Sequence, residues 1–423
     1  MSATPNVSGG VRFLSRNFGL PGQTGIESAM KRGAYEMLKR AVAMKPEDVT
    51  ALVKASGLRG HGGAGFSAGM KWSFVPKDKF PRYVCVNADE SEPGTCKDRL
   101  ILEYDPHLLL EGALICAFAV QAERIYIYIR GEYFYPWRVM EQAIAEARAK
   151  GLIGQNILGT GWSCDVQLAT GAGQYICGEE TGLIESLEGK KGWPRLKPPF
   201  YPAAIGLWGK PTIVNNVETL SFVPRIFEIG AEAFAGMGSP KNGGTGLFSL
   251  SGCVKNPGVY ELPMGTPLQT LLYDLGGGIC GNRKLKALIP GGSSSHILKA
   301  EECENLKLDF ESVAAAGSML GSAAVMAIDE SVSIPRLTLW MARFYAHESC
   351  GQCTPCREGT GWILRLVTRI LEGRGRKRDV DDLFQIADNI DGKTICALGQ
   401  AVAWPTKSYV TKFRHEFDAL VKE

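Results

Sequence analysis

Residues 82–99 read RYVCVNADESEPGTCKDR. The first six, Arg82 to Asn87, are rich in residues typical of a β-strand, and three carboxylates, Asp89, Glu90 and Glu92, follow. If this strand belongs to a parallel sheet, the carboxylates lie at its carboxyl end, where α/β sheets bind ligands. Carboxylates repel phosphate but accept hydrogen bonds from sugar hydroxyls, so the stretch predicts a sugar-binding loop.

The segments around this stretch alternate between strands and helices. Short strands are predicted at Glu123 to Arg130 and Asp165 to Thr170, with a helix at Trp137 to Lys150 between them. Two helices are predicted within residues 26–56. This alternation predicts a largely parallel sheet covered by helices on both faces.

The pattern changes after about residue 240. Strands are predicted at 247–254, 258–262 and 285–289, around one helix at 268–275, which indicates a small α+β domain. From Pro335 onward the apolar spacing is that of a helical bundle, with the basic run 374–378 as a solvated loop. We therefore expect three domains, at residues 1–240, 241–333 and 334–423.

Composition excludes several classes of protein. The 423 residues are 45% apolar and 22% charged, which is neither disordered nor fibrous, and a net charge of +3 does not indicate a nucleic-acid partner. No run of about 18 uncharged apolar residues predicts a membrane span, and Met1 to Leu20 lacks the apolar core of a secretory signal. We expect a cytoplasmic protein, soluble or peripheral, whose twelve cysteines are too sparse for a disulfide scaffold.

Four cysteines form a candidate metal site. Cys350, Cys353 and Cys356 are spaced C-x-x-C-x-x-C, and Cys396 follows on a later segment predicted as helical. Three close cysteines and one remote cysteine match the way a 4Fe-4S cluster is held, whereas structural zinc usually draws on two C-x-x-C pairs. The residues between the first three favour a loop over a helix. Zinc and unligated thiols are the alternatives.

A second candidate is the glycine loop Gly60-His61-Gly62-Gly63-Ala64-Gly65. It satisfies G-x-G-x-x-G, but a helix precedes it where a Rossmann dinucleotide site needs a strand. Its glycines still let backbone N–H groups approach an anion, next to a helix predicted to begin near Phe66 and to carry Lys71. The loop alone is therefore either a phosphate site or a bare turn.

Two further polar stretches follow predicted strands or apolar runs, YICGEET at 175–181 and NNVET at 215–219. With the glycine loop for phosphate and the acidic loop for a ribose or ribityl chain, they predict a nucleotide site. Phe66, Phe74 and Phe200 are candidates to stack on a base, although each is also a plausible core residue.

The motifs together resemble the family of 51 kDa subunits that carry flavin and bind NADH in respiratory complex I. The resemblance rests on GLRGHGGAGFSAGMKWSF at 57–74, NADESEPGTCKDR at 87–99, YICGEETGLIESLEG at 175–189, GKPTIVNNVETL at 209–220 and ESCGQCTPCREGTGW at 348–362. It implies FMN in a Rossmann-like domain, NADH stacked on the flavin, a ubiquitin-like β-grasp module at about 245–330 and a 4Fe-4S cluster in a C-terminal helical bundle.

The resemblance also implies site residues. FMN contacts would be Arg59, Gly60, Gly62, Lys71, Asn87, Asp89, Glu90, Tyr175, Gly178, Glu179, Asn215, Asn216 and Thr219. NADH contacts would be Gly63, Gly65, Phe66, Phe74, Glu92, Glu179, Glu180, Lys197 and Phe200. Of these residues, Glu90, Tyr175 and Glu179 would lie at the reacting centre. The cluster ligands would be Cys350, Cys353, Cys356 and Cys396.

Three positions depart from the family pattern. His61 stands where Arg is common, Gly182 where Ala is usual, and Tyr201 separates Phe200 from Pro202. The last departure makes Tyr201 an alternative to Phe200 for stacking on adenine.

The implied activity is NADH dehydrogenation. The flavin takes a hydride and passes single electrons to the cluster and on to a quinone-reducing chain. The implied partners are a small 2Fe-2S protein of the 24 kDa type and the large iron-sulfur protein of complex I, with membrane contact only through partners. The implied place is the cytoplasmic side of a bacterial inner membrane, or the matrix side in a mitochondrion. The alternatives are the diaphorase component of an NAD-linked hydrogenase or formate dehydrogenase, and a zinc-stabilised nucleotide sensor or scaffold.

Overall fold

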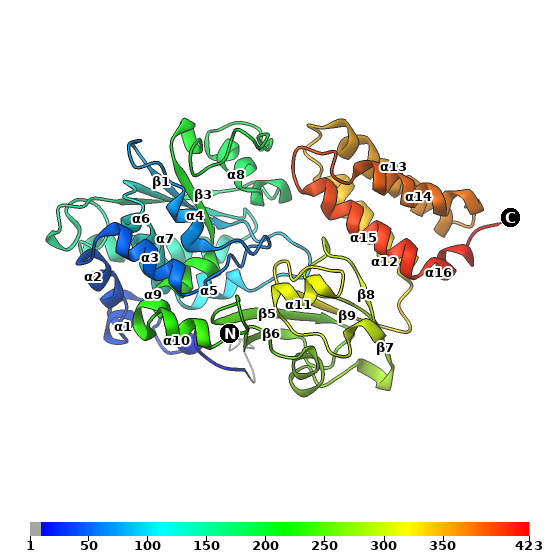
Figure 1. Cartoon of the computed structure of the whole chain (residues 1–423), viewed down its shortest axis with the longest axis horizontal. Coiled ribbons are helices and arrows are strands. Elements are labelled where there is room, and N and C mark those ends of the chain that lie inside the picture. Colours follow the sequence, from blue (N-terminus) through cyan, green and yellow to red (C-terminus); the bar gives the residue numbers. More distant parts are fainter. Residues whose placement is uncertain (1–9, 423) are drawn as a thin grey trace.

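The computed structural model describes residues 10–422. It contains a parallel sheet covered by helices, a second, mixed sheet, and a group of C-terminal helices (Figure 1). The predicted fold class, a Rossmann-like α/β domain followed by a small α+β domain and a helical bundle, is confirmed. The prediction about Met1 to Leu20 falls partly outside the described residues.

Four parallel strands form the first sheet in the order β3-β2-β1-β4. Their bounds are β1 Tyr83–Ala88, β2 Arg124–Ile129, β3 Asp165–Thr170 and β4 Thr212–Asn216. The chain passes outward from β1 to β3 and then returns to place β4 on the other side of β1. The carboxyl ends of β1 and β4 therefore form a topological switch point, the place where open α/β sheets bind ligands.

Strands β1, β2 and β4 are buried on both faces, whereas the edge strand β3 is mostly partly exposed. Val84 and Val86 of β1 belong to the core shared with α6 (Pro106–Ala119) and α9 (Val217–Ile229), whereas Cys85 belongs to the core shared with α8 (Glu180–Leu187). Helix α6 is almost entirely buried, and His107 and Glu111 are its only residues of the Asp, Glu, His, Lys and Arg types. Gly112 permits the close approach of α9, since a Cβ there would lie 1.9 Å from the carbonyl oxygen of Leu220.

The helices before the sheet differ from the prediction. Residues 26–56 form three helices rather than two, α1 Ile26–Lys31, α2 Glu36–Val42 and α3 Pro46–Ala55. The break arises because Gly33 and Tyr35 take positive φ angles of 93° and 67°, which no α-helix accommodates. The helix after the glycine loop, α4 (Ala68–Ser73), begins two residues later than predicted, after Ser67 as N-cap. Helices α5 (Asp98–Tyr104) and α7 (Phe134–Ala149) complete this part.

The second sheet has the order β6-β5-β9-β7-β8 and follows α10 (Ala231–Gly236). Its strands are β5 Thr245–Gly252, β6 Gly258–Pro263, β7 Leu285–Ile289, β8 Leu298–Lys299 and β9 Ala324–Asp329. The predicted strands near 247, 258 and 285 are confirmed, and the predicted helix is a short π-helix, Thr270–Leu275. Strands β4, β8 and β9 and helix α11 (Phe310–Ala315) were not predicted, because their short runs lack a clear period.

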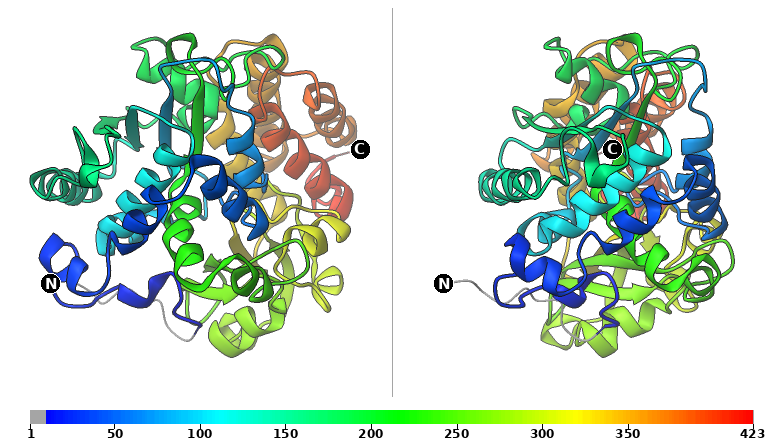
Figure 2. Two further views of the ribbon diagram at one scale, coloured as in Figure 1. Left: turned by 60° about the vertical axis from the view of Figure 1, so that its left-hand side comes forward. Right: turned by 90° about the vertical axis from the view of Figure 1, so that its left-hand side faces the viewer.

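The C-terminal part is helical, as predicted. Its helices are α12 Ile334–Glu348, α13 Thr354–Leu371, α14 Lys377–Ile390, α15 Leu398–Lys412 and α16 Arg414–Asp418 (Figures 1 and 2, orange to red). Two details of the cysteine prediction are wrong: Cys356 lies in the first turn of α13 instead of a loop, and Cys396 lies on a bend just before α15 instead of a helix. The basic run 374–378 begins as a loop, but Lys377 already opens α14. Within residues 10–422, no helix is long and apolar enough to cross a membrane.

Candidate functional site

A cleft of about 630 Å³ opens at the carboxyl ends of β1 and β4. The volume falls in the range of small-molecule sites. The glycine loop and the acidic loop form one wall, loops of the second sheet form another, and α15 forms a third. The three parts of the chain therefore meet around this cleft (Figures 1 and 2).

Most of the residues predicted to contact FMN or NADH line this cleft, and four do not. The lining includes Gly60, Gly62, Gly63, Gly65, Phe66, Lys71, Asn87, Asp89, Glu90, Glu92, Tyr175, Gly178, Glu179, Glu180, Lys197, Asn215 and Asn216. Arg59, Phe74, Phe200 and Thr219 are not part of the lining. Five segments far apart in the sequence thus converge on one cavity.

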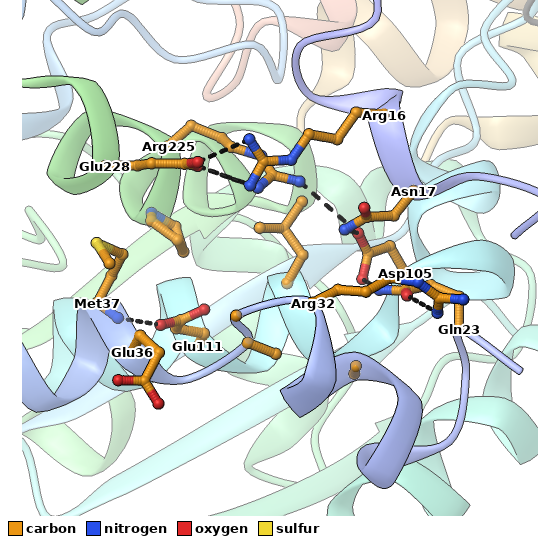
Figure 3. A pocket seen from close by; sticks show the side chains of 15 residues that line it. Arg16, Asn17, Gln23, Arg32, Glu36, Met37, Asp105, Glu111, Arg225 and Glu228 are labelled. Carbon is orange, nitrogen blue, oxygen red and sulfur yellow. Dashed lines mark hydrogen bonds and ion pairs between the residues drawn. The ribbon is translucent and has the colours of Figure 1, made fainter.

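A smaller cavity, of about 210 Å³, lies where the N-terminal segment packs on α6 and α9 (Figure 3). Its charged groups already have protein partners: Arg225 and Arg16 both contact Glu228, Asp105 accepts hydrogen bonds from Asn17 and Gln23, and Glu111 accepts the N–H of Met37. Acidic and basic side chains are mixed in its lining, so the cavity shows no clear preference for an anion or a cation. We regard it as a polar packing contact.

The glycine loop presents backbone, not side chains, to the cleft. Gly63 has a φ of 120° and a Cβ there would meet nothing within 4 Å, so its backbone faces open space. Gly65 has a φ of 62°, and a Cβ there would lie 2.6 Å from the ring of Phe310. The loop closes with a hydrogen bond from the N–H of Gly60 to the carbonyl of Phe66, 2.8 Å. This is the geometry expected of a loop that approaches an anionic ligand through its backbone.

Asp89 provides an unused acceptor inside the cleft. It is 8% exposed, and its Oδ2 atom has no hydrogen-bond partner within the described part of the chain. Burial raises the pKa of this carboxyl to about 7, against the opposing effect of Arg130. A buried polar atom without a partner costs free energy unless a ligand or water satisfies it. Asp89 therefore fits the hydroxyl groups of a ribityl or ribose chain.

The carboxylate of Glu90 is largely occupied by protein groups. It accepts the backbone N–H groups of Lys97 and Asp98 at 2.8 Å each and of Arg99 at 3.1 Å, which cap the start of α5. It also accepts the hydroxyl of Tyr133 at 2.9 Å. Glu90 thus holds the acidic loop against α5, with its own backbone near the cleft.

Two lysines and two glutamates form an ion-pair group at the start of α8. The Nζ atom of Lys197 lies 2.9 Å from Glu179 and 2.7 Å from Glu180, and the Nζ atom of Lys71 lies 3.2 Å from Glu180. Burial alone would raise the pKa of Glu180, but the opposing effects of Lys71 and Lys197 are larger. The pKa of Glu180 is therefore lowered. Glu179 also caps α8 through the N–H groups of Thr181 and Gly182. The group offers both cations for phosphates and carboxylates for sugar hydroxyls.

The four predicted residues outside the lining have other contacts. The guanidinium of Arg59 lies 4.2 Å from the ring centre of Phe310 and donates to the carbonyl of Gly65, and Thr219 accepts the backbone N–H of His61 at 2.9 Å. Phe74 packs on Phe66, with ring centres 6.1 Å apart. Phe200 is 39% exposed and the neighbouring Tyr201 is 54% exposed, so the two aromatics are similarly accessible.

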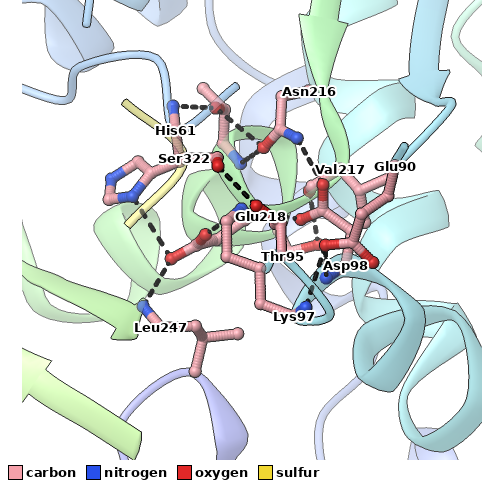
Figure 4. Close-up of polar contacts among 12 residues, drawn as sticks. His61, Glu90, Thr95, Lys97, Asp98, Asn216, Val217, Glu218, Leu247 and Ser322 are labelled. Atoms are coloured by element: carbon pink, nitrogen blue, oxygen red, sulfur yellow. Dashed lines mark hydrogen bonds and ion pairs between the residues drawn. The ribbon is translucent and has the colours of Figure 1, made fainter. Parts of the chain in front are cut away.

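A buried charge network lies beneath the glycine loop (Figure 4). Glu218, fully buried, contacts the Nζ atom of Lys97 at 2.5 Å and the Nδ1 atom of His61 at 3.2 Å, and accepts the N–H of Leu247 at 2.8 Å. Burial raises the pKa of Glu218, but Lys97 and His61 outweigh it and lower the pKa to about 2. The network joins the glycine loop to α5, to α9 and to the second sheet.

The ring of Tyr175 stands between the acidic loop and α12. Its hydroxyl donates to Glu92 at 2.6 Å, and Glu92 also accepts the N–H of Ser294 at 2.8 Å. The ring makes edge contacts with Phe344 and Tyr345, at 5.3 and 6.0 Å between ring centres. Both ends of the Tyr175 side chain are therefore fixed by different parts of the chain.

The four candidate cluster ligands are neighbours and carry no disulfide. Cys353 is the N-cap of α13 and Cys356 lies in its first turn, where the positive end of the helix dipole favours an anionic group. Burial raises the pKa of Cys356 to about 11 and of Cys396 to about 12, and Cys350 is near enough to contribute to both shifts.

The donor set suits a cluster better than zinc. Across residues 10–422, no three Cys, His, Asp or Glu side chains converge as a single metal ion would require. Zinc needs four ligands about 2.3 Å from one centre, whereas a cubane takes each thiolate at a different iron. Three closely spaced cysteines and one remote cysteine match the ligand pattern of the second case.

Several lining residues were not found by sequence reasoning. They are Thr95, Lys97, Asp98, Gly291, Ser294, Met319, Ser322, Gln400 and Trp404, among others. Lys97 and Asp98 lie in the quoted stretch 82–99, where their position just after the acidic loop was a usable signal. Gln400 and Trp404 reach the cleft only because α15 packs beside it, and nothing in their local sequence indicates this.

Comparison with known proteins matches three regions of the chain. Residues 53–225 match the model of the Nuo51 FMN-binding domain, residues 246–325 the SLBB domain, and residues 336–420 the NADH-ubiquinone oxidoreductase-F iron-sulfur binding region. The chain is 50% identical to the F subunit of the NADH-quinone oxidoreductase of Rickettsia bellii over 94% of this chain and 95% of that protein, and 48% identical to its counterpart in Rickettsia akari.

The fold is also similar to that of a solved structure. A crystal structure of NAD+-reducing [NiFe]-hydrogenase in the H2-reduced state matches with a TM-score of 0.84 and 36% identity. The match covers 92% of this chain, and this chain spans 65% of the hydrogenase chain. The predicted resemblance is thus confirmed, and the chain belongs to the family of NADH-quinone oxidoreductase F subunits, oxidoreductases with an FMN-binding domain and a 4Fe-4S binding region.

Proposed function

We propose that the cleft binds FMN with its phosphate on the glycine loop and its ribityl chain on the acidic loop, and that NADH enters over the flavin. When bound, FMN accepts a hydride from NADH and the 4Fe-4S cluster accepts electrons singly. The proposal assigns the predicted lining residues to this site, with Asp89 as the acceptor for a ribityl hydroxyl. The orphaned Oδ2 atom of Asp89 supports that assignment.

The protein contributes positioning rather than acid-base chemistry. The backbone of Gly63 and Gly65 lets the ligands approach closely, and Lys71 and Lys197 offer cations for phosphate oxygens. Phe66, 45% exposed at the edge of the cleft, is placed to pack on a ring. The three walls would surround the reacting atoms.

One observation carries the proposed electron route. Ala397 lines the cleft and is the residue directly after Cys396, one of the proposed cluster ligands. The proposed flavin site and the proposed cluster site therefore share a wall. Electrons leaving the cleft would reach the cluster without crossing any other part of the protein.

The ion-pair group predicts donor preference. Glu179 and Glu180 would accept hydrogen bonds from the adenosine ribose and repel a 2′-phosphate, so NADH is the expected donor over NADPH. Comparing kcat/KM for the two donors, with ferricyanide as acceptor, tests this. Equal values would refute it.

The decisive experiment is an anaerobic titration of purified protein with NADH. We expect loss of the flavin absorbance together with a paramagnetic cluster signal, and about one FMN and four irons per chain, as the 4Fe-4S assignment requires. With FMN supplied in excess, a Cys353→Ser variant should keep the flavin response and lose the cluster signal. Colourless protein containing one zinc would refute the proposal and favour a nucleotide sensor.

The proposed setting is a membrane-associated respiratory complex. The names of the relatives denote one component of a larger oxidoreductase, so partner subunits are implied. We propose a small 2Fe-2S partner and a large iron-sulfur partner, on the cytoplasmic side of a bacterial membrane or its mitochondrial equivalent. The hydrogenase likeness keeps a diaphorase role as the second candidate. Co-purification with a quinone-reducing complex or with a hydrogenase separates the two.

A further inference from the structure

The turn that carries Tyr175 is held by a glutamate of the helical domain. Glu348, the last residue of α12, is 8% exposed. Its Oε2 atom accepts the backbone N–H of Tyr175 at 2.8 Å and the Nε2 group of Gln174 at 3.0 Å. Its carbonyl oxygen accepts the same Gln174 group at 3.1 Å. Two donors from the cleft turn 174–178 therefore converge on one residue of the helical domain.

The same residue adjoins the proposed cluster loop. Ser349 and Cys350 follow Glu348 directly, and the hydroxyl of Ser349 lies 3.2 Å from the sulfur of Cys356. A second contact crosses the same boundary, because the indole N–H of Trp193 donates to the carbonyl of Cys350 at 3.0 Å. The start of the cysteine loop is thus fastened to the nucleotide-binding part at two points.

No ion pair explains the burial of Glu348. Among the ion pairs of residues 10–422 none includes this carboxylate, and the groups that donate to it are neutral. A buried carboxylate is costly without a cation, so its hydrogen bonds must compensate. Its carboxylate accepts hydrogen bonds from Gln174 and Tyr175. The burial of Glu348 is therefore explained by the hydrogen bonds that it accepts from the turn 174–178.

We propose that Glu348 is a positioning residue that couples the cysteine loop to the flavin site. An assembled cluster would fix residues 350–356 and with them the end of α12, and Glu348 would then fix the turn carrying Tyr175. Without the cluster, the turn would loosen and FMN would bind less tightly. By linkage, bound FMN would stabilise the cluster to the same extent. This inference rests on the proposed FMN and cluster sites.

The test measures FMN affinity in cluster-loaded protein and in protein whose cluster has been removed by chelation. The probe is FMN itself, whose fluorescence reports free ligand. In the unmodified protein, we expect cluster removal to raise the Kd for FMN about tenfold, since a hydrogen bond to a charged acceptor corresponds to roughly that factor or more. In Glu348→Ala, the loaded protein should already show the raised Kd, and cluster removal should change it less than about twofold.

Two further variants serve as a conservative substitution and as a control. Glu348→Gln keeps an acceptor for the Tyr175 N–H and should retain most of the coupling. Glu358→Ala removes an exposed glutamate of α13, which pairs with Arg357, and should behave as the unmodified protein. If Glu348→Ala does not fold, Glu348→Asp, whose shorter side chain withdraws the acceptor, replaces it. An unchanged Kd and an unchanged tenfold cluster effect in Glu348→Ala or its replacement would overturn the proposal.

A second readout does not depend on FMN. Amide hydrogen exchange of residues 174–178 should be about tenfold faster in Glu348→Ala than in Glu358→Ala, because the Tyr175 N–H loses its acceptor. If the protein binds no FMN but shows this exchange difference, the proposed function fails while the positioning contact stands. Equal exchange in the two variants would overturn the contact itself.

Discussion

Glu218→Gln removes one negative charge from the buried network beneath the glycine loop while keeping the shape of the side chain. In the native protein this carboxylate lies 2.5 Å from the ammonium of Lys97 and 3.2 Å from the imidazole of His61 (Figure 4). Lys97 is 1% exposed, so water cannot replace the lost partner. The variant leaves a buried cation with a weakened counter-charge.

The expected cost follows from these contacts. Breaking a buried ion pair destabilises a protein by about 3–5 kcal/mol. Two contacts soften the loss: Asp98 remains 3.0 Å from Lys97, and the amide oxygen of the new side chain can still accept the N–H of Leu247. We therefore expect the lower end, about 3 kcal/mol, or roughly a hundredfold shift in the folding equilibrium.

The assay is urea unfolding of cofactor-free protein at neutral pH, followed by tryptophan fluorescence and circular dichroism. The control is Glu27→Gln, whose carboxylate is 71% exposed and pairs with Lys150, and which should leave the midpoint unchanged. Lys97→Met and the double variant complete a cycle. The double variant should be less destabilised than the sum of the single variants by at least about 1 kcal/mol.

The pH dependence of stability provides a second test of the ion pair. The folded-state pKa of Glu218 is lowered to about 2, from an ordinary value of 4.5. Its contribution is therefore full above pH 4.5 and is lost as the pH falls toward 2. The difference between the unmodified protein and Glu218→Gln should be constant from pH 5 to 8 and shrink below pH 4.5. Additive single variants and a difference that does not shrink in acid would refute the ion-pair argument.

Three other predictions concern the cleft and the cysteines. Gly65→Ala should cost about 1–2 kcal/mol in backbone strain alone and weaken FMN binding about tenfold, because φ is 62° and the new Cβ meets Phe310. Gly236→Ala, with nothing within 4 Å and no positive φ, should have neither effect, and equal FMN affinity in the two variants would contradict the role of the loop. Cys353→Ser should lose iron and acid-labile sulfide while Cys280→Ser keeps both, and full iron content in the first would exclude Cys353 as a ligand. Burial raises the pKa of Asp89 to about 7, so ligand-free protein should lose stability as the pH rises from 4 toward 7, with the loss reduced in Asp89→Asn. Thermal midpoints at pH 5.5 and 8 measure this, and identical pH profiles for the two proteins would count against it.

The sequence predicts those structural features that depend on residues close together in the chain. Strand β1 and the loop after it follow from an apolar run that ends in carboxylates, and the candidate ligands Cys350, Cys353 and Cys356 are recognisable from their spacing. The switch point between β1 and β4 could not be predicted in this way, because β4 is a five-residue strand with only three apolar or β-branched residues before two asparagines. Its place in the sheet is decided by pairing with β1, a contact between distant segments.

The site shows the same limit. The glycine loop and the carboxylates indicated a nucleotide pocket. However, the carboxylate of Glu90 is occupied by N–H groups at the start of α5, and the guanidinium of Arg59 packs on Phe310. Residue type predicts what a side chain can bind, but only packing decides whether the protein itself has already bound it. The wall from α15, with Trp404, depends entirely on how the helices assemble.

That third wall has a consequence for biosynthesis. Gln400 and Trp404 come far after the glycine loop in the sequence, so they leave the ribosome later than it does. A nascent chain could thus assemble the parallel sheet and yet offer an open, half-built groove until α15 has docked. Enclosure of the proposed cofactor would therefore follow the docking of α15, and a fragment limited to residues 53–225 would release it readily.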